Sequence, residues 1–499
     1  MTGLQEEGRQ LQRSPSFDSL FDEDPEDSSR SQQLLRSPSC DSLFDEDPGD
    51  SSRSSQLQRS PSFDSLFDEE LQRNAFPSPP AWLEEDPACG LVWRKNGLSV
   101  DAAWTVEPTI ESIIATLKVK VGLNHDYNVQ FLHEGAFTKL YTVSFDNQAF
   151  VMRVSLPVCP RTKTEAEVAT LDWVHLHTRL RVPHVKAYDS SRNNPLGFEW
   201  VLMEKLHGKP LSQCWSSWTY GLKRRLVRQI ADFTAATFNK AFQDGIGSIS
   251  KAASNSDGRT HDHNRGPFFE TSDWVRSRLQ FALSDLTSRL SSTTSEAEKE
   301  MLHRMVELTR RIERLMPKFI SSSDHIASQE TTLYTAEEGP ALTMLFHDSL
   351  SLDNMLVDDQ GVLRGVLDWQ CIPCVPLQEG CQFPAFLQQK YDRFREPFRR
   401  FYLGDEDRPH PAYYKHYNQY ELTKLRRYYI AQMLDRERSF MGIWRDKSSA
   451  DWRDYEAAVQ NCDNEFTISA VEKWVEAMER GKNPAQVPKR LHELLMEWD

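Results

Sequence analysis

The chain lacks any run of apolar residues that could cross a membrane, since no stretch reaches the roughly 18 residues that a transmembrane helix needs. It also lacks a basic excess, because 59 Lys and Arg stand against 74 Asp and Glu and give a net charge of −15. We therefore expect neither a membrane nor a nucleic-acid partner. The acidic, Ser-rich start has no apolar core of signal length, which predicts a cytoplasmic protein, with the nucleus as the alternative.

Cysteine is sparse and follows no disulfide framework. Eight Cys are scattered over 499 residues, a pattern typical of free thiols in a reducing compartment. Cys371, Cys374 and Cys381 form the one cluster, and the first two have the spacing of half a zinc site. No second pair follows, so we favour small apolar side chains over a metal site at this cluster.

Most of the negative charge lies in a repetitive tail. Residues 1–73 hold 17 acidic and 7 basic side chains, and the unit R-S-P-S-F/C-D-S-L-F-D-E begins at Arg13, Arg36 and Arg59, a period of 23 residues. Each copy offers about three apolar side chains, too few to offset an ordering entropy of roughly 1–2 kcal/mol per residue. We therefore predict a disordered tail over residues 1–78.

Two interpretations of this tail stay open. Ser14, Ser37 and Ser60 each precede a proline, so the repeats are candidate targets of a kinase. The apolar residues of each copy, such as Phe17, could then contact a protein partner. The alternative is a duplicated, solvated tail without a partner.

C-terminal to the tail, the apolar pattern predicts two lobes. Helices are expected at 110–121 and 163–180, and strands at 129–132, 139–145, 149–155 and 198–203. Beyond residue 204 the stripes at 222–238 and 301–315 predict helices, interrupted by two short strands at 355–357 and 363–367. This order predicts an α+β fold with an antiparallel-sheet lobe over 79–204 and a helical lobe over 205–499.

The residues between 345 and 370 predict a phosphoryl-transfer site. Asn354 and Asp368 flank a predicted hairpin, so both side chains come to one end of it, where they could share Mg²⁺. In such loops an acid lies five residues before the Asn and orients the attacking hydroxyl. That position holds Ser349, whose hydroxyl is too weakly basic to replace a carboxylate. The adjacent Asp348 is the candidate substitute.

A second group of residues would face the nucleotide phosphates. Gly135 lies between two predicted strands, where a phosphate-covering turn would be, although a single glycine is also typical of an ordinary hairpin. Arg153 lies on a strand where a cation could meet the α- and β-phosphates, and Glu165 or Glu167 on the next helix could pair with it. A lone Arg on a strand is otherwise most often a surface charge.

The apolar strand that ends at Glu204 is followed by Lys205, Leu206 and the sequence G-K-P. This is the pattern of a hinge between two lobes. Backbone groups near Glu204 and Leu206 would then be free to bind the edge of an adenine base.

In this order, these residues resemble the aminoglycoside phosphotransferase and choline kinase superfamily, in particular its fungal members, over about residues 125–430. Its most specific parts here are 151–171, 202–211 and 346–369. The resemblance implies a two-lobed, protein-kinase-like fold that uses ATP and Mg²⁺ on a small hydroxylated molecule. It also implies that Arg153 replaces the phosphate-binding Lys with Glu167 as its partner, and that Asn354 and Asp368 are the metal ligands.

This chain departs from the family pattern at Ser349, at Arg153 and at Ala136 in the phosphate-covering turn. Loss of a positioned base typically lowers the rate by about 10²–10⁴. Two hypotheses follow: an impaired small-molecule phosphotransferase in which Asp348 or water replaces the base, or a pseudo-phosphotransferase that binds a nucleotide or a protein. The sequence does not identify the acceptor.

Overall fold

In a computed structural model of the chain, the structure describes residues 90–96, 99–122, 126–242, 245–249, 266–320, 342–389, 391–403, 408–482, 484–487 and 490–495. The chain divides into two compact units, Met1–Asn74 and Ala75–Asp499. The predicted disordered tail and its repeats lie outside the described residues. The second unit contains all the elements described below.

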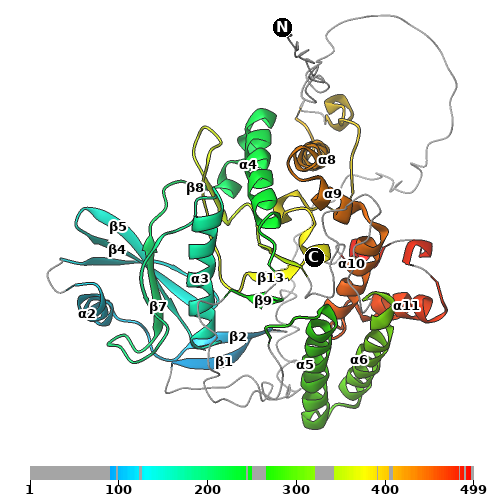
Figure 1. The fold of residues 1–499 in the computed structure, drawn as a ribbon, viewed down its shortest axis with the longest axis horizontal. Helices are drawn as coiled ribbons and strands as arrows, with labels where there is room; N and C mark the ends of the chain where they lie inside the picture. The colour runs from blue at the N-terminus through cyan, green and yellow to red at the C-terminus, as the bar shows by residue number, and fades with distance from the viewer. Residues whose placement is uncertain are drawn as a thin grey trace, which may run out of the picture. The chain divides into compact units, whose positions relative to one another are not determined.

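The N-terminal lobe is built on a five-stranded antiparallel sheet (Figure 1). In sheet order its strands are β3 (Asn128–Glu134), β4 (Thr138–Phe145), β5 (Gln148–Ser155), β7 (Glu199–Glu204) and β6 (Val185–Asp189). Strands β4 and β5 meet at a tight turn in which Asp146 and Asn147 both have positive φ, 49° and 58°. Such a turn matches the twist of a hairpin, and Asn and Asp tolerate its left-handed backbone better than most residues.

Two helices and a separate hairpin complete this lobe. The helices are α2 (Ile110–Lys120) and α3 (Thr162–His177), and the hairpin pairs β1 (Leu91–Asn96) with β2 (Ser99–Trp104). Side chains from the sheet, α2 and β1 share one hydrophobic core. The carboxylate of Glu199 fixes the start of α3, because it accepts the Arg161 N–H at 2.7 Å and the Thr164 hydroxyl at 2.6 Å. An anion in this place also complements the helix dipole.

The C-terminal lobe is mainly helical. Its helices are α4 (Tyr220–Phe238), α5 (Thr271–Ser292), α6 (Glu296–Leu315), α7 (Leu377–Gly380), α8 (Pro411–Arg436), α9 (Arg438–Arg445), α10 (Lys447–Gln460), α11 (Ile468–Glu479) and α12 (Leu491–Leu495). They bury two cores. One lies around α4, α8, α9 and the short strands, and the other lies among α5, α6, α10, α11 and α12.

Two small sheets lie within this lobe. One has the order β12 (Leu363–Val366), β11 (Met355–Val357), β8 (Lys209–Pro210), and the other has the order β10 (Thr343–Leu345), β13 (Pro373–Pro376), β9 (Gly247–Ser248). Strand β8 follows the last strand of the N-terminal lobe after only four residues. The segment that joins the two lobes is therefore hydrogen-bonded directly to the β11–β12 hairpin.

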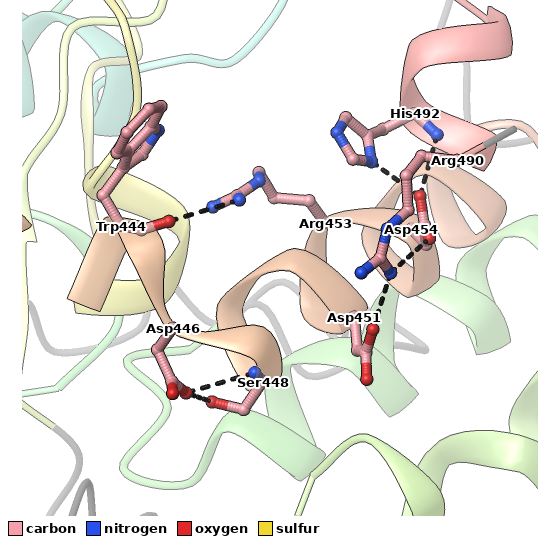
Figure 2. Close-up of polar contacts among 8 residues, drawn as sticks. All are labelled: Trp444, Asp446, Ser448, Asp451, Arg453, Asp454, Arg490 and His492. Carbon is pink, nitrogen blue, oxygen red and sulfur yellow. Dashed lines mark hydrogen bonds and ion pairs between the residues drawn. The ribbon is translucent and has the colours of Figure 1, made fainter. Parts of the chain in front are cut away.

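A buried carboxylate holds the C-terminal helix in place (Figure 2). Asp454 on α10 is fully buried, and it accepts bonds from the Arg490 guanidinium at 3.1 Å and from the His492 ring at 2.6 Å. Arg490 also donates to Asp451 at 2.6 Å. These bonds join α12 to α10 through charged groups as well as apolar packing.

The predicted two-lobed α+β fold is confirmed. The helix expected to run to Leu180 ends at His177, because Thr178 is extended and its hydroxyl donates to the Val174 carbonyl. The β1–β2 hairpin was not predicted, although the dipeptide Asn96-Gly97 is a strong hairpin signal. No helix within the described ranges is both long enough and apolar enough to cross a bilayer.

Candidate active site

The predicted cation of the N-terminal lobe forms a buried ion pair. Arg153 on β5 is 7% exposed and Glu167 on α3 is 2% exposed. The two terminal nitrogens of the guanidinium donate to the two carboxylate oxygens, while the buried Nε has no partner. Of the two candidate acids, the structure therefore brings Glu167, and not Glu165, to Arg153. The role of the pair in phosphate binding stays a prediction.

The turn between β3 and β4 holds Gly135. Its N–H donates to the Thr138 carbonyl at 2.8 Å, and the Phe137 carbonyl accepts the Leu156 N–H at 2.9 Å. These bonds tie the turn to β4 and to the end of β5. A Cβ added at Gly135 would lie 3.2 Å from the Thr138 hydroxyl, so the turn is closely packed. Its function as a phosphate cover is not established by this geometry.

The predicted hinge is held on both sides. The Glu204 carboxylate accepts a hydrogen bond from Arg181 at 2.7 Å. The main-chain N–H of Glu204 donates to the His184 carbonyl at 2.9 Å. The side chain of Leu206 is buried, and a Cβ added at Gly365 on β12 would lie only 2.2 Å from its Cδ1. Within the described chain the Leu206 N–H donates to no backbone carbonyl, and its role toward a base stays a prediction.

The two predicted metal ligands lie at the same end of the β11–β12 hairpin. The Leu367 N–H donates to the Asn354 carbonyl at 2.8 Å, and Met355 pairs with Val366. Asp368, the next residue, is exposed and has a φ of +60°. The Asn354 side-chain nitrogen donates to the Ser349 carbonyl at 2.9 Å, which leaves its Oδ1 as the free acceptor. An amide oxygen and a carboxylate fit the oxygen ligands that Mg²⁺ prefers.

Ser349 occupies the position expected for the base, and its hydroxyl contacts the adjacent Asp348. Ser349 Oγ donates to Asp348 Oδ1 at 2.8 Å, and the Asp348 side chain is exposed. The buried His347 before it contacts Leu367 O through Nε2 at 3.2 Å and packs edge-on against Trp369 at 4.7 Å between ring centroids.

Burial lowers the pKa of His347, whereas the Leu367 carbonyl and the Asp348 and Asp368 carboxylates raise it. The imidazole is thus kept neutral near pH 7.

Sequence analysis missed one charged residue of this region, Lys163 on α3. It is 9% exposed, and the charges that act on it include Arg153, Glu167 and Cys371. No sequence signal distinguishes it from the surface lysines of the same segment. Of the three clustered cysteines, Cys374 and Cys381 are buried and Cys371 is exposed.

A cavity of about 490 Å³ lies in the helical lobe, between α5 and the end of α10. Its walls include Phe268, Trp274, Arg278, Phe281 and Asp463. Arg278 stacks on Trp274 with its guanidinium carbon 4.7 Å from the ring centroid. Helix α5 contributes Trp274, Arg278 and Phe281 to this wall.

Comparisons with known proteins agree with the sequence-based resemblance. Residues 128–376 match the Phosphotransferase enzyme family. A subtelomeric hrmA-associated cluster protein of Aspergillus fumigatus is 32% identical over 125 residues, which are 24% of this chain and 25% of that protein. Altered inheritance of mitochondria protein 9 of Meyerozyma guilliermondii is 28% identical over 122 residues, 23% of this chain and 20% of that protein. The chain thus spans a quarter or less of the length of these two curated relatives.

Among solved structures, an apo crystal structure of a thermostable mutant of aminoglycoside phosphotransferase APH(4)-Ia is 13% identical. The alignment covers 75% of this chain and 99% of that chain, with a TM-score of 0.37.

The comparisons contradict the predicted cytoplasmic or nuclear location. Relatives from Meyerozyma guilliermondii, Candida glabrata and Saccharomyces cerevisiae are named as mitochondrial proteins. The expectation was wrong because it rested on the absence of an apolar signal segment, a feature that bears on secretion and not on entry into mitochondria.

Proposed function

Since residues 128–376 of this chain belong to the phosphotransferase enzyme family, we propose that the protein binds ATP with magnesium and transfers the γ-phosphoryl group slowly to a small hydroxylated molecule. One observation carries this proposal. The 2.8 Å bond from the Leu367 N–H to the Asn354 carbonyl brings an amide and the adjacent Asp368 carboxylate to one end of a short hairpin. Sites of this kind hold the metal that accompanies the nucleotide.

Different residues of this chain would bind the metal, the phosphates and the base. Asn354 Oδ1 and Asp368 would hold Mg²⁺, which neutralises charge on the phosphate oxygens when it is bound. The Arg153 guanidinium, fixed by Glu167, presents a positive charge on the sheet side of the site. The Leu206 N–H lies in the segment between the lobes, where it would donate to the adenine base.

Asp348 is the one carboxylate of the loop placed to receive the proton of the acceptor. In the transfer, the acceptor oxygen forms a bond to the γ-phosphorus, the bond from that phosphorus to the β–γ bridging oxygen breaks, and ADP leaves. The acceptor proton passes to the Asp348 carboxylate, whose other oxygen accepts the Ser349 hydroxyl at 2.8 Å. Because Asp348 is exposed and one position from the usual base, we expect a rate about 10²–10⁴ below that of a site with a positioned base.

A second candidate function rests on the hydrogen bond from Ser349 to Asp348. The Ser349 hydroxyl donates to one oxygen of Asp348, so part of the hydrogen-bonding capacity of this carboxylate is already used. If this contact persists when nucleotide is bound, the protein is a nucleotide-binding module without turnover. In that case its output is an interaction with another protein.

The test measures binding and turnover in the same preparation. The full chain should bind ATP in a Mg²⁺-dependent way by calorimetry, and should consume ATP above background with some member of a set of amino alcohols and sugars. Asp348→Asn should lower that turnover at least tenfold, whereas the matched change Ser349→Ala should leave it within about threefold. ATP binding without consumption for any acceptor would favour the binding module, and no Mg²⁺-dependent ATP binding would contradict both candidates.

We also propose that the protein acts in mitochondria, as the names of its yeast relatives suggest. A fluorescent protein fused after Asp499 in the source organism should coincide with a mitochondrial matrix marker. Uniform cytosolic fluorescence would contradict this location.

A further inference from the structure

Lys163, at the start of α3, is a buried lysine that has no part in the function proposed above. Its side chain is 9% exposed, so more than nine-tenths of it is withdrawn from water. The first turn of α3 is fixed in place by the bonds of Arg161 and Thr164 to the Glu199 carboxylate. The ammonium is therefore presented from a rigid part of the fold.

The ammonium lies beside the turn that holds Gly135 and within electrostatic range of the Arg153–Glu167 pair. Its Nζ lies 5.9 Å from the ring centroid of Phe137, in the turn that holds Gly135. Its charge is opposed by Arg153 and favoured by Glu167. The Glu199 carboxylate also favours its charge.

Arg153 and Lys163 differ in how they are paired. Both terminal nitrogens of Arg153 are taken up by Glu167. By contrast, the Lys163 ammonium forms no hydrogen bond to, and no ion pair within 4.0 Å of, any residue that the structure describes. An ammonium that is largely surrounded by protein and has no close anion is stabilised by a ligand that supplies one. In keeping with this, burial and the nearby Arg153 charge lower the pKa of Lys163.

We infer that Lys163 contacts the phosphates of the bound nucleotide and adds a second positive charge to that of Arg153. The inference rests on the proposed binding of ATP and adds a residue to it. An ammonium is a compact donor that can follow phosphate oxygens, whereas the forked guanidinium of Arg153 is fixed by its bidentate partner. Lys163 should accordingly distinguish ATP from adenosine.

Calorimetry with Mg²⁺ on the full chain tests this role. Lys163→Met should weaken ATP binding about tenfold to a hundredfold and leave adenosine binding within about twofold, and Lys163→Arg should retain part of the ATP affinity. The matched control Lys118→Met, at an exposed lysine of α2, should change neither. ATP affinity that is unchanged in Lys163→Met, or an equal loss for ATP and adenosine, would overturn the role of Lys163. If the unaltered protein bound no ATP, the proposed function itself would fail as well.

A labelling experiment on the unaltered protein gives an answer even where a variant does not fold. An acyl-phosphate derivative of ATP transfers its acyl group to a lysine amine beside the terminal phosphate. Mass spectrometry should find this acyl group on Lys163, and excess ATP but not adenosine should prevent it. Labelling of other lysines with none on Lys163 would refute the inference.

Discussion

The side-chain amide of Asn354 donates to the main-chain carbonyl of Ser349 at 2.9 Å and so closes the loop across five residues. This bond uses only the backbone of Ser349. The position of the Cα at residue 349 is therefore fixed without help from its side chain, and the site expected for a base is retained while the base itself is absent.

Because that backbone is retained, Ser349→Asp should restore a positioned carboxylate. We expect ATP turnover with an active acceptor to rise about 10²-fold or more. Initial rates of ADP formation at saturating MgATP measure this. The neighbouring change Ser351→Asp adds the same charge outside the position and should not raise the rate. A Ser349→Asp protein with unchanged turnover would mean that residue 349 does not face the acceptor.

Asn354→Ala should separate metal binding from nucleotide binding. The change removes both the amide oxygen offered to Mg²⁺ and the bond to the Ser349 carbonyl, so the Mg²⁺ concentration that gives half-maximal ATP binding should rise about tenfold. Titration of Mg²⁺ at fixed ATP measures it. The matched control Asp353→Ala, at the adjacent exposed carboxylate, should leave the midpoint in place, and an equal shift in both variants would contradict the assignment of Asn354.

Glu379 on α7 should make stability depend on pH. Burial and the nearby Glu456 raise the pKa of its carboxyl to about 7 from an ordinary 4.5. Between these values the folded chain keeps the proton and the unfolded chain releases it, so the free energy of unfolding falls as pH rises from about 4.5 to 7. Glu379→Gln should remove this fall, and its stability relative to the unaltered protein should increase by on the order of 2–3 kcal/mol between pH 4.5 and 7.5.

Urea denaturation at both pH values measures this difference. The control Glu300→Gln, at an exposed residue of α6, should show no such pH dependence. A constant difference between Glu379→Gln and the unaltered protein would show that the buried carboxyl is ionised in the folded state at both pH values.

Asp454→Ala should destabilise the attachment of the C-terminal helix. The change leaves the Arg490 guanidinium with Asp451 alone and the His492 ring without its partner, at a cost of about 3–5 kcal/mol in the free energy of unfolding. The control Asp446→Ala removes a helix cap that accepts the Ser448 N–H at 3.1 Å and the Ser448 hydroxyl, and it should cost about 1 kcal/mol. Equal losses in the two variants would show that the buried network contributes no more than a helix cap.

The repeats of the tail give a prediction about partners. Phosphorylation of the serines that precede proline would add charge to a candidate docking segment, so replacing all three by Ala should weaken capture of a partner in a pull-down from native extract. The serines to be changed are Ser14, Ser37 and Ser60, and the matched controls, two residues later in each repeat, are Ser16, Ser39 and Ser62. An identical set of captured proteins for both variants would support a tail without a partner.

The sequence predicted those features that local chemistry determines. The turn at 359–361 and the apolar runs beside it located the β11–β12 hairpin, and the spacing of Asn354 and Asp368 brought both to one end of it. The sequence also predicted the alternating strands at 139–145 and 149–155, which are β4 and β5.

Tertiary contacts determine what was missed. Lys163 is buried because the Phe137 turn and the Cys371 loop come to it from distant parts of the chain, and no pattern within α3 records that. Likewise, the choice of Glu167 over Glu165 as the partner of Arg153 depends on how α3 is rotated against β5.

The absence of a side chain at Gly365 allows the segment between the two lobes to pack closely against the β11–β12 hairpin. The Leu206 methyl group fills the space that a larger residue would occupy, and β8 continues from this segment into the same sheet as the hairpin. A residue larger than glycine at position 365 would force the Leu206 side chain to move, and the pairing of β8 with β11 would carry that shift into the hairpin.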